Sequence, residues 1–189
     1  MGFSALKTWF AQRMPNSQQI AAVYGVIVLV VYGWTIYWYL WKLPSWLYFM
    51  TLTEMLVAFA YAMAVNFLES ILILLVPILL CLFLPSRWFR DQFVAQGAIL
   101  VVLILVALMQ YLNIITSLQD LPPGMGRMAL LVMVGIVFLV FLVGRIGFLG
   151  KVIAEIANRA TIFLYIFMPI SALSLLVVLF RNIVEVLNG

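Results

Sequence analysis

Hydrophobic positions form long runs along this chain, and polar residues gather in short clusters between them. A membrane-spanning helix needs about 20 consecutive apolar residues, and five or six runs approach this length. The pattern therefore predicts an all-α, polytopic integral membrane helix bundle that forms a single transmembrane domain over residues 1–189. The predicted spans lie at about 19–41, 46–65, 69–85, 93–115, 128–144 and 160–180.

The apolar run from Trp46 to Pro85 decides how many spans we expect. One straight helix of roughly 40 residues would be about 60 Å long, whereas the hydrocarbon core is about 30 Å thick. Two short spans fit this thickness better, and Asn66–Ser70 is the only polar cluster near the middle of the run. The length therefore predicts a hairpin with its turn at this cluster, and six transmembrane helices in total.

The positions of the basic residues favour a different count. If residues 46–85 cross only once, seven Lys and Arg residues share one side of the membrane and three share the other. A hairpin gives six against four, so the positive-inside rule prefers five spans. We nevertheless expect six spans with both termini outside, because one long crossing needs a partner to cover its protruding apolar surface.

Two shorter segments combine apolar and basic positions at helical spacing. They lie near residues 3–14 and 147–159. This combination is typical of a helix that lies in the membrane interface, so we expect a short interfacial helix at each of them.

Composition agrees with a membrane location and removes several classes of function. The chain is 68% hydrophobic and 8% charged, with a mean hydropathy of +1.25, so it lacks the charges of a soluble surface. Its ten Lys and Arg residues are scattered, whereas nucleic-acid binders cluster theirs. There is no histidine and only one cysteine, and we recognise no metal site, cofactor site or catalytic motif. We expect a multi-pass protein of a prokaryotic-type inner or plasma membrane, or of an organelle.

Glu54 and Glu69 are the only acidic residues that interrupt the apolar runs. If a span starts at Trp46, Glu54 lies about two turns inside it, where a carboxylate must be paired, hydrated or protonated. Tyr61, Asn66 and Glu69 extend the same helical face, so these four residues form a candidate intramembrane polar site. Glu54 is either a protonatable group in a transport path or a structural acid, and Asn66 and Glu69 also suit a turn.

Small and amide side chains indicate where helices meet. Ala58 and Ala62 have the small-xxx-small spacing that lets two helices approach closely. Gln110 and Asn113 lie on one face of the fourth predicted span, and amides in lipid usually hydrogen-bond between helices. We therefore predict helix–helix contacts at all four residues.

The sparse polar residues do not converge in the way that an enzyme requires. We expect a non-catalytic integral membrane subunit, or an assembly or scaffold partner, of a larger membrane protein complex. Its expected partners are the lipid bilayer and other membrane protein subunits. The alternative is a small transporter or channel-like protein that uses Glu54 as an intramembrane protonatable or ion-binding site.

Overall fold

The chain folds into helices that are joined by short connections. The computed structural model describes residues 14–84, 89, 92–117 and 124–188, and these residues include no strand. The helices are α2 (Ser17–Trp46), α3 (Leu52–Phe83), α4 (Phe93–Ser117), α5 (Met125–Arg145), α6 (Gly147–Ala160) and α7 (Ile162–Asn188). The all-α prediction is confirmed, and five helical segments of the described residues are long and apolar enough to cross a membrane.

The expected hairpin is replaced by one continuous helix. Helix α3 runs from Leu52 to Phe83 without a break at residues 66–70, so the count of six transmembrane helices is not confirmed. Two residues of the polar cluster instead face the neighbouring helix. Asn66 and Ser70 are four residues apart, lie on one side of α3 and are both buried. Each hydrogen-bonds to a side chain of α2, so these two polar residues make contacts between helices.

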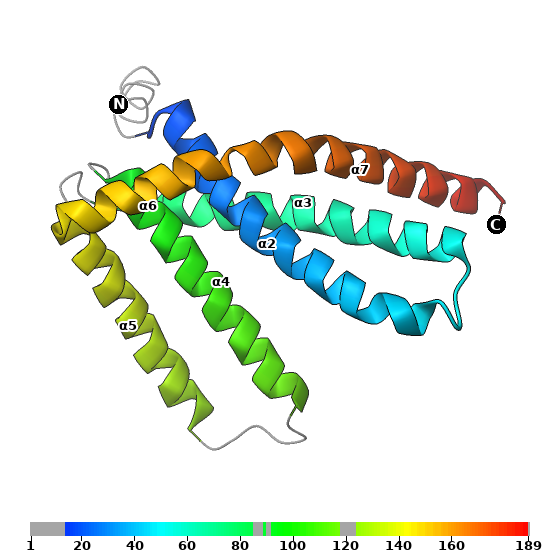
Figure 1. The fold of residues 1–189 in the computed structure, drawn as a ribbon, viewed down its shortest axis with the longest axis horizontal. Coiled ribbons are helices and arrows are strands. Elements are labelled where there is room, and N and C mark those ends of the chain that lie inside the picture. Colours follow the sequence, from blue (N-terminus) through cyan, green and yellow to red (C-terminus); the bar gives the residue numbers. More distant parts are fainter. Residues whose placement is uncertain (1–13, 85–88, 90–91, 118–123, 189) are drawn as a thin grey trace, which may run out of the picture.

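Helix α2 lies at the centre of the molecule and contacts α3, α4, α6 and α7. Helices α3 and α7 lie side by side and extend away from α6 in one direction, whereas α4 and α5 extend from it in another (Figure 1). We call α2, α3 and α7 the central layer, and α4 and α5 the arm. The start of α2 lies at the same end of the molecule as the start of α4 (Figure 1).

The core is apolar and is built largely around the first half of α2. Val23, Ile27 and Tyr32 of α2 are almost fully buried, and they belong to one cluster with Met63 of α3 and Phe93 of α4. A second cluster consists of small side chains where α2, α4 and α6 meet. Its members are Ala22, Val26, Ala98, Ala157 and Ala160.

Helix α6 corresponds to the short helix that we expected near residues 147–159. Its buried residues are Gly150, Ala157 and Ala160, whereas Arg159 and Glu155 are exposed and form an ion pair of 3.1 Å. The segment is therefore an amphipathic helix that precedes α7. The other expected interfacial helix, near residues 3–14, falls almost entirely outside the described residues.

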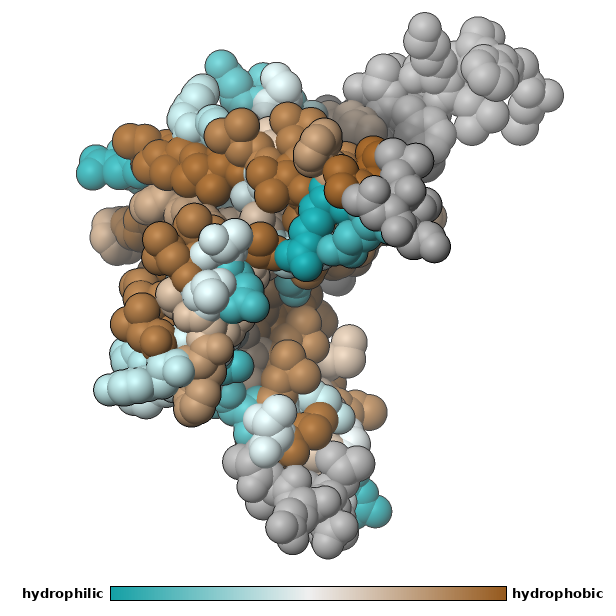
Figure 2. All heavy atoms as spheres, turned by 90° about the vertical axis from the view of Figure 1, so that its right-hand side faces the viewer, coloured by the Kyte–Doolittle hydropathy of each residue, from teal (hydrophilic) through white to brown (hydrophobic). Residues whose placement is uncertain are grey.

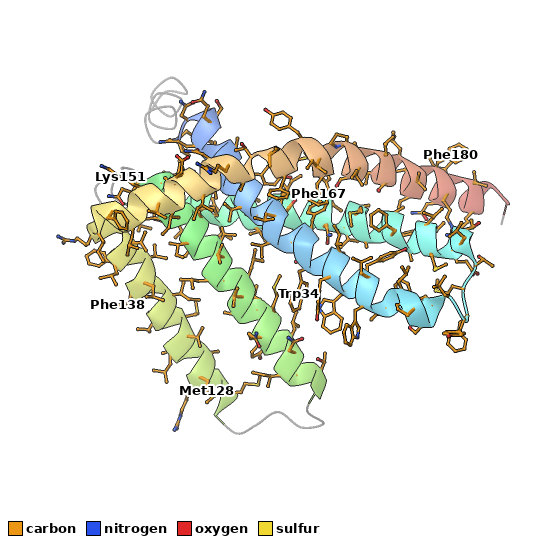
Figure 3. All side chains as sticks on the ribbon, viewed as in Figure 1. Trp34, Met128, Phe138, Lys151, Phe167 and Phe180 are labelled. Atoms are coloured by element: carbon orange, nitrogen blue, oxygen red, sulfur yellow. The ribbon has the colours of Figure 1, made fainter. Side chains whose placement is uncertain are left out.

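Apolar side chains also cover much of the outer surface. Figure 2 shows them over large parts of one face, with polar side chains in smaller patches between them. Most side chains of α5 are exposed, including Phe138, which points away from α4 (Figure 3). An exterior of this kind is compatible with an integral membrane protein.

Candidate functional site

Polar side chains of α2 connect it to both other helices of the central layer. Three of these residues contact α3 and one contacts α7, through groups that lie within hydrogen-bonding distance. The pairs are Tyr24 Oη–Ser70 Oγ (3.2 Å), Tyr32 Oη–Ser171 Oγ (2.6 Å), Thr35 Oγ1–Asn66 Oδ1 (3.0 Å) and Tyr39 Oη–Met55 carbonyl oxygen (3.0 Å). Each of these polar groups of α2 therefore contacts one neighbouring helix, and the contacts are spread along the length of α2.

Tyr61, which we predicted to be part of the polar site, connects α3 to α7. Its hydroxyl donates to Asn182 Oδ1 at 3.0 Å. The guanidinium of Arg181 lies 6.0 Å from the centre of the Tyr61 ring, and Arg181 forms an ion pair of 2.8 Å with Glu185. This group stabilises the contact between the beginning of α3 and the end of α7.

Glu54 lies at a different depth from the one that we expected. Helix α3 begins at Leu52 and not at Trp46, so Glu54 belongs to its first turn and is exposed. Glu54 Oε2 accepts hydrogen bonds from the backbone N–H of Thr51 at 2.7 Å and from its hydroxyl at 2.9 Å. The Thr51 hydroxyl oxygen accepts in turn from the N–H of Glu54. This is a capping box, which satisfies free N–H groups at a helix start; a transport role for Glu54 stays a prediction.

The structure separates the four residues of the predicted polar site. Asn66 is buried against α2, and its Nδ2 has no hydrogen-bond partner among the described residues. Glu69, only three residues later, is exposed on another side of α3. Glu54 and Tyr61 make the separate contacts described above. The four side chains therefore do not form one cluster.

The residues that we predicted at helix contacts differ in burial. Ala58 and Ala62 are half-buried on α3. Gln110 of α4 is exposed, and Asn113 is half-buried. Asn113 lines a groove of about 580 Å³ together with Met109 of α4 and with six residues of α2, which are Leu29, Val30, Gly33, Trp34, Tyr37 and Trp38. Figure 3 shows Trp34 of this groove on the side of α2 that faces α4.

A second cavity, of about 340 Å³, lies where the starts of α2, α4 and α6 meet. Gln19, Gln92 and Lys151 line it, together with Gly147 and Gly150. The Gln92 Oε1 atom is buried, has no hydrogen-bond partner among the described residues, and lies close to Gly150. The described lining of the cavity contains no acidic residue, so it offers no acid–base pair for a reaction.

Sequence reasoning missed the buried partners of α2. Tyr24, Tyr32, Ser70 and Ser171 are buried, but single hydroxyls inside apolar runs give no signal of their partners. Gln96, buried on α4 against Gly144 of α5, was equally inconspicuous. Among the described residues, no three His, Cys, Asp or Glu side chains are placed to hold a metal ion.

Comparison with known proteins adds no family to these observations. The chain matches no family model, no curated protein and no solved structure. Function must therefore be inferred from the arrangement of the chain's own residues.

Proposed function

We propose that the chain is a multi-pass integral membrane protein, and that it serves as a non-catalytic subunit or assembly partner of a larger membrane protein complex. One observation carries this proposal: hydroxyls of α2, buried at Tyr24 and Tyr32 and half-buried at Thr35, pair with single partners on adjacent helices. A catalytic centre or a transport path needs several polar groups that converge on one place. Hydrogen-bonded pairs that are spread along a helix instead fix the register of that helix against its neighbours, which is a structural role.

We infer five membrane crossings, by α2, α3, α4, α5 and α7, with α6 at the interface. The continuous α3 supports a single crossing where a hairpin was expected. Under this topology the basic residues divide seven against three, and the more basic side would face the cytoplasm. That side carries Lys7, Arg13, Arg87, Arg90, Arg145, Lys151 and Arg159.

The length of α3 supports association with other proteins. Its 32 residues span about 48 Å at 1.5 Å per residue, against a hydrocarbon core of about 30 Å. Helix α7 covers one flank of α3 and α2 covers another, and tilting of the helix reduces the mismatch further. The remaining apolar flank of α3 is exposed and suits a contact with another subunit.

Purification from native membranes in a mild detergent tests the proposed role. We expect other membrane proteins to co-purify in a fixed ratio and to migrate with the chain in size-exclusion chromatography and native mass spectrometry. A parallel preparation from membranes without the tagged chain is the control. A chain that purifies alone and catalyses flux in liposomes would contradict the proposal and favour a transporter.

Cysteine labelling tests the number of crossings independently. Ser45→Cys and Ser86→Cys, each made in a Cys81→Ala background, place one thiol on either side of the long apolar segment. An impermeant maleimide added to sealed vesicles should label only one of the two variants, and detergent should allow labelling of both. Labelling of both variants from the same face would instead support the hairpin and six spans.

A further inference from the structure

The side chain of Glu69 is a carboxylate exposed near the middle of a long apolar helix. It lies near the midpoint of Leu52–Phe83, roughly 20 Å or more from either end at 1.5 Å per residue. None of the described residues forms an ion pair or a hydrogen bond with it. If α3 crosses the membrane, this carboxylate lies deep in the bilayer and outside the chain's own core.

Glu69 belongs to an apolar row that continues along the same side of α3. The row repeats with spacings of four and three residues, which is the seam pattern of helices that pack side by side. Its apolar members are 41% to 79% exposed. We call this row the α3 stripe, and its members are Val65, Glu69, Leu72, Val76, Leu79 and Phe83.

Lipid alone does not suit the surface of the α3 stripe. Hydrocarbon cannot solvate an ionised carboxylate, and acidic residues in membrane helices almost always face protein or water and pair with another group. With α3 centred in a hydrocarbon core about 30 Å thick, Glu69 lies about 13 Å from the nearer edge, which is beyond the reach of a short side chain. The apolar neighbours on the stripe, in contrast, suit close packing against a second helix. Both features point to a protein partner with a charge opposite to that of Glu69.

We propose that the α3 stripe binds a transmembrane helix of a different subunit, and that this helix places a Lys or Arg side chain opposite Glu69. The inference rests on the proposed function and makes it more specific. In a seam of this kind a single polar position sets the register of the two helices, and a buried ion pair rejects partners that lack the matching charge. Glu69 is thus the residue that selects the partner.

A second copy of the chain does not provide the required charge. Within the described residues, every Lys and Arg lies within about two turns of an end of its helix. Two copies that met at their α3 stripes would bring two Glu69 carboxylates together and would supply no opposing charge. The partner is therefore a different protein.

Photo-crosslinking in native membranes tests this inference. A photoreactive phenylalanine replaces Leu72 or Val76 on the stripe, or Val134 or Val137 on the exposed side of α5 as controls. We expect one discrete adduct with another membrane protein from the stripe positions, and no such adduct from α5. Mass spectrometry of the adduct should find a Lys or Arg within the cross-linked transmembrane segment.

Charge exchange then tests the role of Glu69. Glu69→Lys should reduce the adduct about tenfold or more, because it opposes two positive charges in a buried contact. Changing the partner's basic residue to Glu should restore the adduct in the Glu69→Lys chain. Glu69→Gln should cause a smaller loss, since it keeps a polar group but removes the charge. Because Glu69 is exposed and forms no hydrogen bond or ion pair with the described residues, the thermal midpoint of each purified variant should stay close to that of the wild type.

The other outcomes overturn the inference. Adducts with lipid only, an adduct with a second copy, or an adduct that is insensitive to Glu69→Lys would each show that the stripe does not select a basic helix. If the complex still co-purified in such a case, the proposed function would stand and only this inference would fail. A chain that purified alone from native membranes would contradict both.

Discussion

The central layer and the arm are held together by different kinds of contact. Within the central layer, α2 is hydrogen-bonded to α3 and α7 through side chains such as Tyr32 and Thr35. In the arm, α5 buries only Ile136, Val140 and Val143 as large apolar side chains. Among the described residues, none of the side-chain hydrogen bonds named above joins α5 to another helix.

In a membrane, which is the proposed location, the hydrophobic effect between helices is weak, and the difference shows two ways to position helices there. Hydrogen bonds in apolar surroundings are directional and fix the register of two helices. Small residues allow close approach, and their contacts depend on shape alone. The central layer also contains a contact of the second type. It lies at Gly25, where α2 crosses the junction of α6 and α7. Gly144 shows the second type within the arm.

The largest expected effect is at Gly25. A Cβ atom there would lie 2.7 Å from the backbone carbonyl carbon and oxygen of Ala160, and a backbone cannot move aside as a side chain can. We expect Gly25→Ala to reduce the free energy of unfolding by about 2–3 kcal/mol. Gly33→Ala is the matched control, since a Cβ at this position of the same helix meets nothing within 4 Å.

Thermal unfolding in detergent, followed by circular dichroism, measures both variants. Gly33→Ala should be neutral or stabilising by about 0.5–1 kcal/mol, because alanine favours the helix. Equal midpoints for the two variants would show that α2 does not approach the α6–α7 junction as closely as the structure indicates.

A smaller effect is expected where α2 meets α7. Tyr32→Phe removes the hydroxyl that lies 2.6 Å from Ser171 Oγ and leaves a buried polar atom without its partner. We expect a loss of about 1 kcal/mol, in the range measured for hydrogen bonds between membrane helices. Tyr37→Phe, on an exposed side chain of the same helix, should have almost no effect.

A double-mutant cycle decides whether the hydrogen bond is responsible. Adding Ser171→Ala to Tyr32→Phe should cost less than the sum of the two single substitutions, because the second change removes the unpaired group. Strictly additive losses would contradict a direct interaction and indicate that each residue acts through packing alone.

Much of the architecture could be predicted from the apolar runs. The runs predicted at 19–41, 93–115, 128–144 and 160–180 are helical in the structure almost throughout, because segments this long and apolar have few alternatives to a helix. The run at 46–85 was misinterpreted. Periodicity cannot distinguish a polar pair that forms a turn from a polar pair that faces another helix. Asn66 and Ser70 are a pair of the second kind, because both contact α2.

The local position of Glu54 could have been predicted better. Thr51-Leu52-Thr53-Glu54 matches the capping-box pattern, which marks a helix start near Leu52 and places the carboxylate in the first turn. The partners of Tyr24 and Tyr32 could not be predicted in the same way. A single sequence does not indicate which side of an apolar helix faces which neighbour, so Ser70 and Ser171 become partners only in the folded chain.

The smallest effect that we predict is in the arm, at Gly144 of α5. A Cβ atom there would overlap the side-chain amide of Gln96 on α4, but the end of a flexible side chain can turn away. Turning is not free of cost, because Gln96 is buried and its Oε1 already lacks a partner among the described residues. We therefore expect Gly144→Ala to destabilise by less than about 1 kcal/mol, well below the loss at Gly25. Gly135→Ala, on the same helix with nothing within 4 Å of a Cβ, is the control. A loss at Gly144 as large as that at Gly25 would show that the arm is held as rigidly as the central layer.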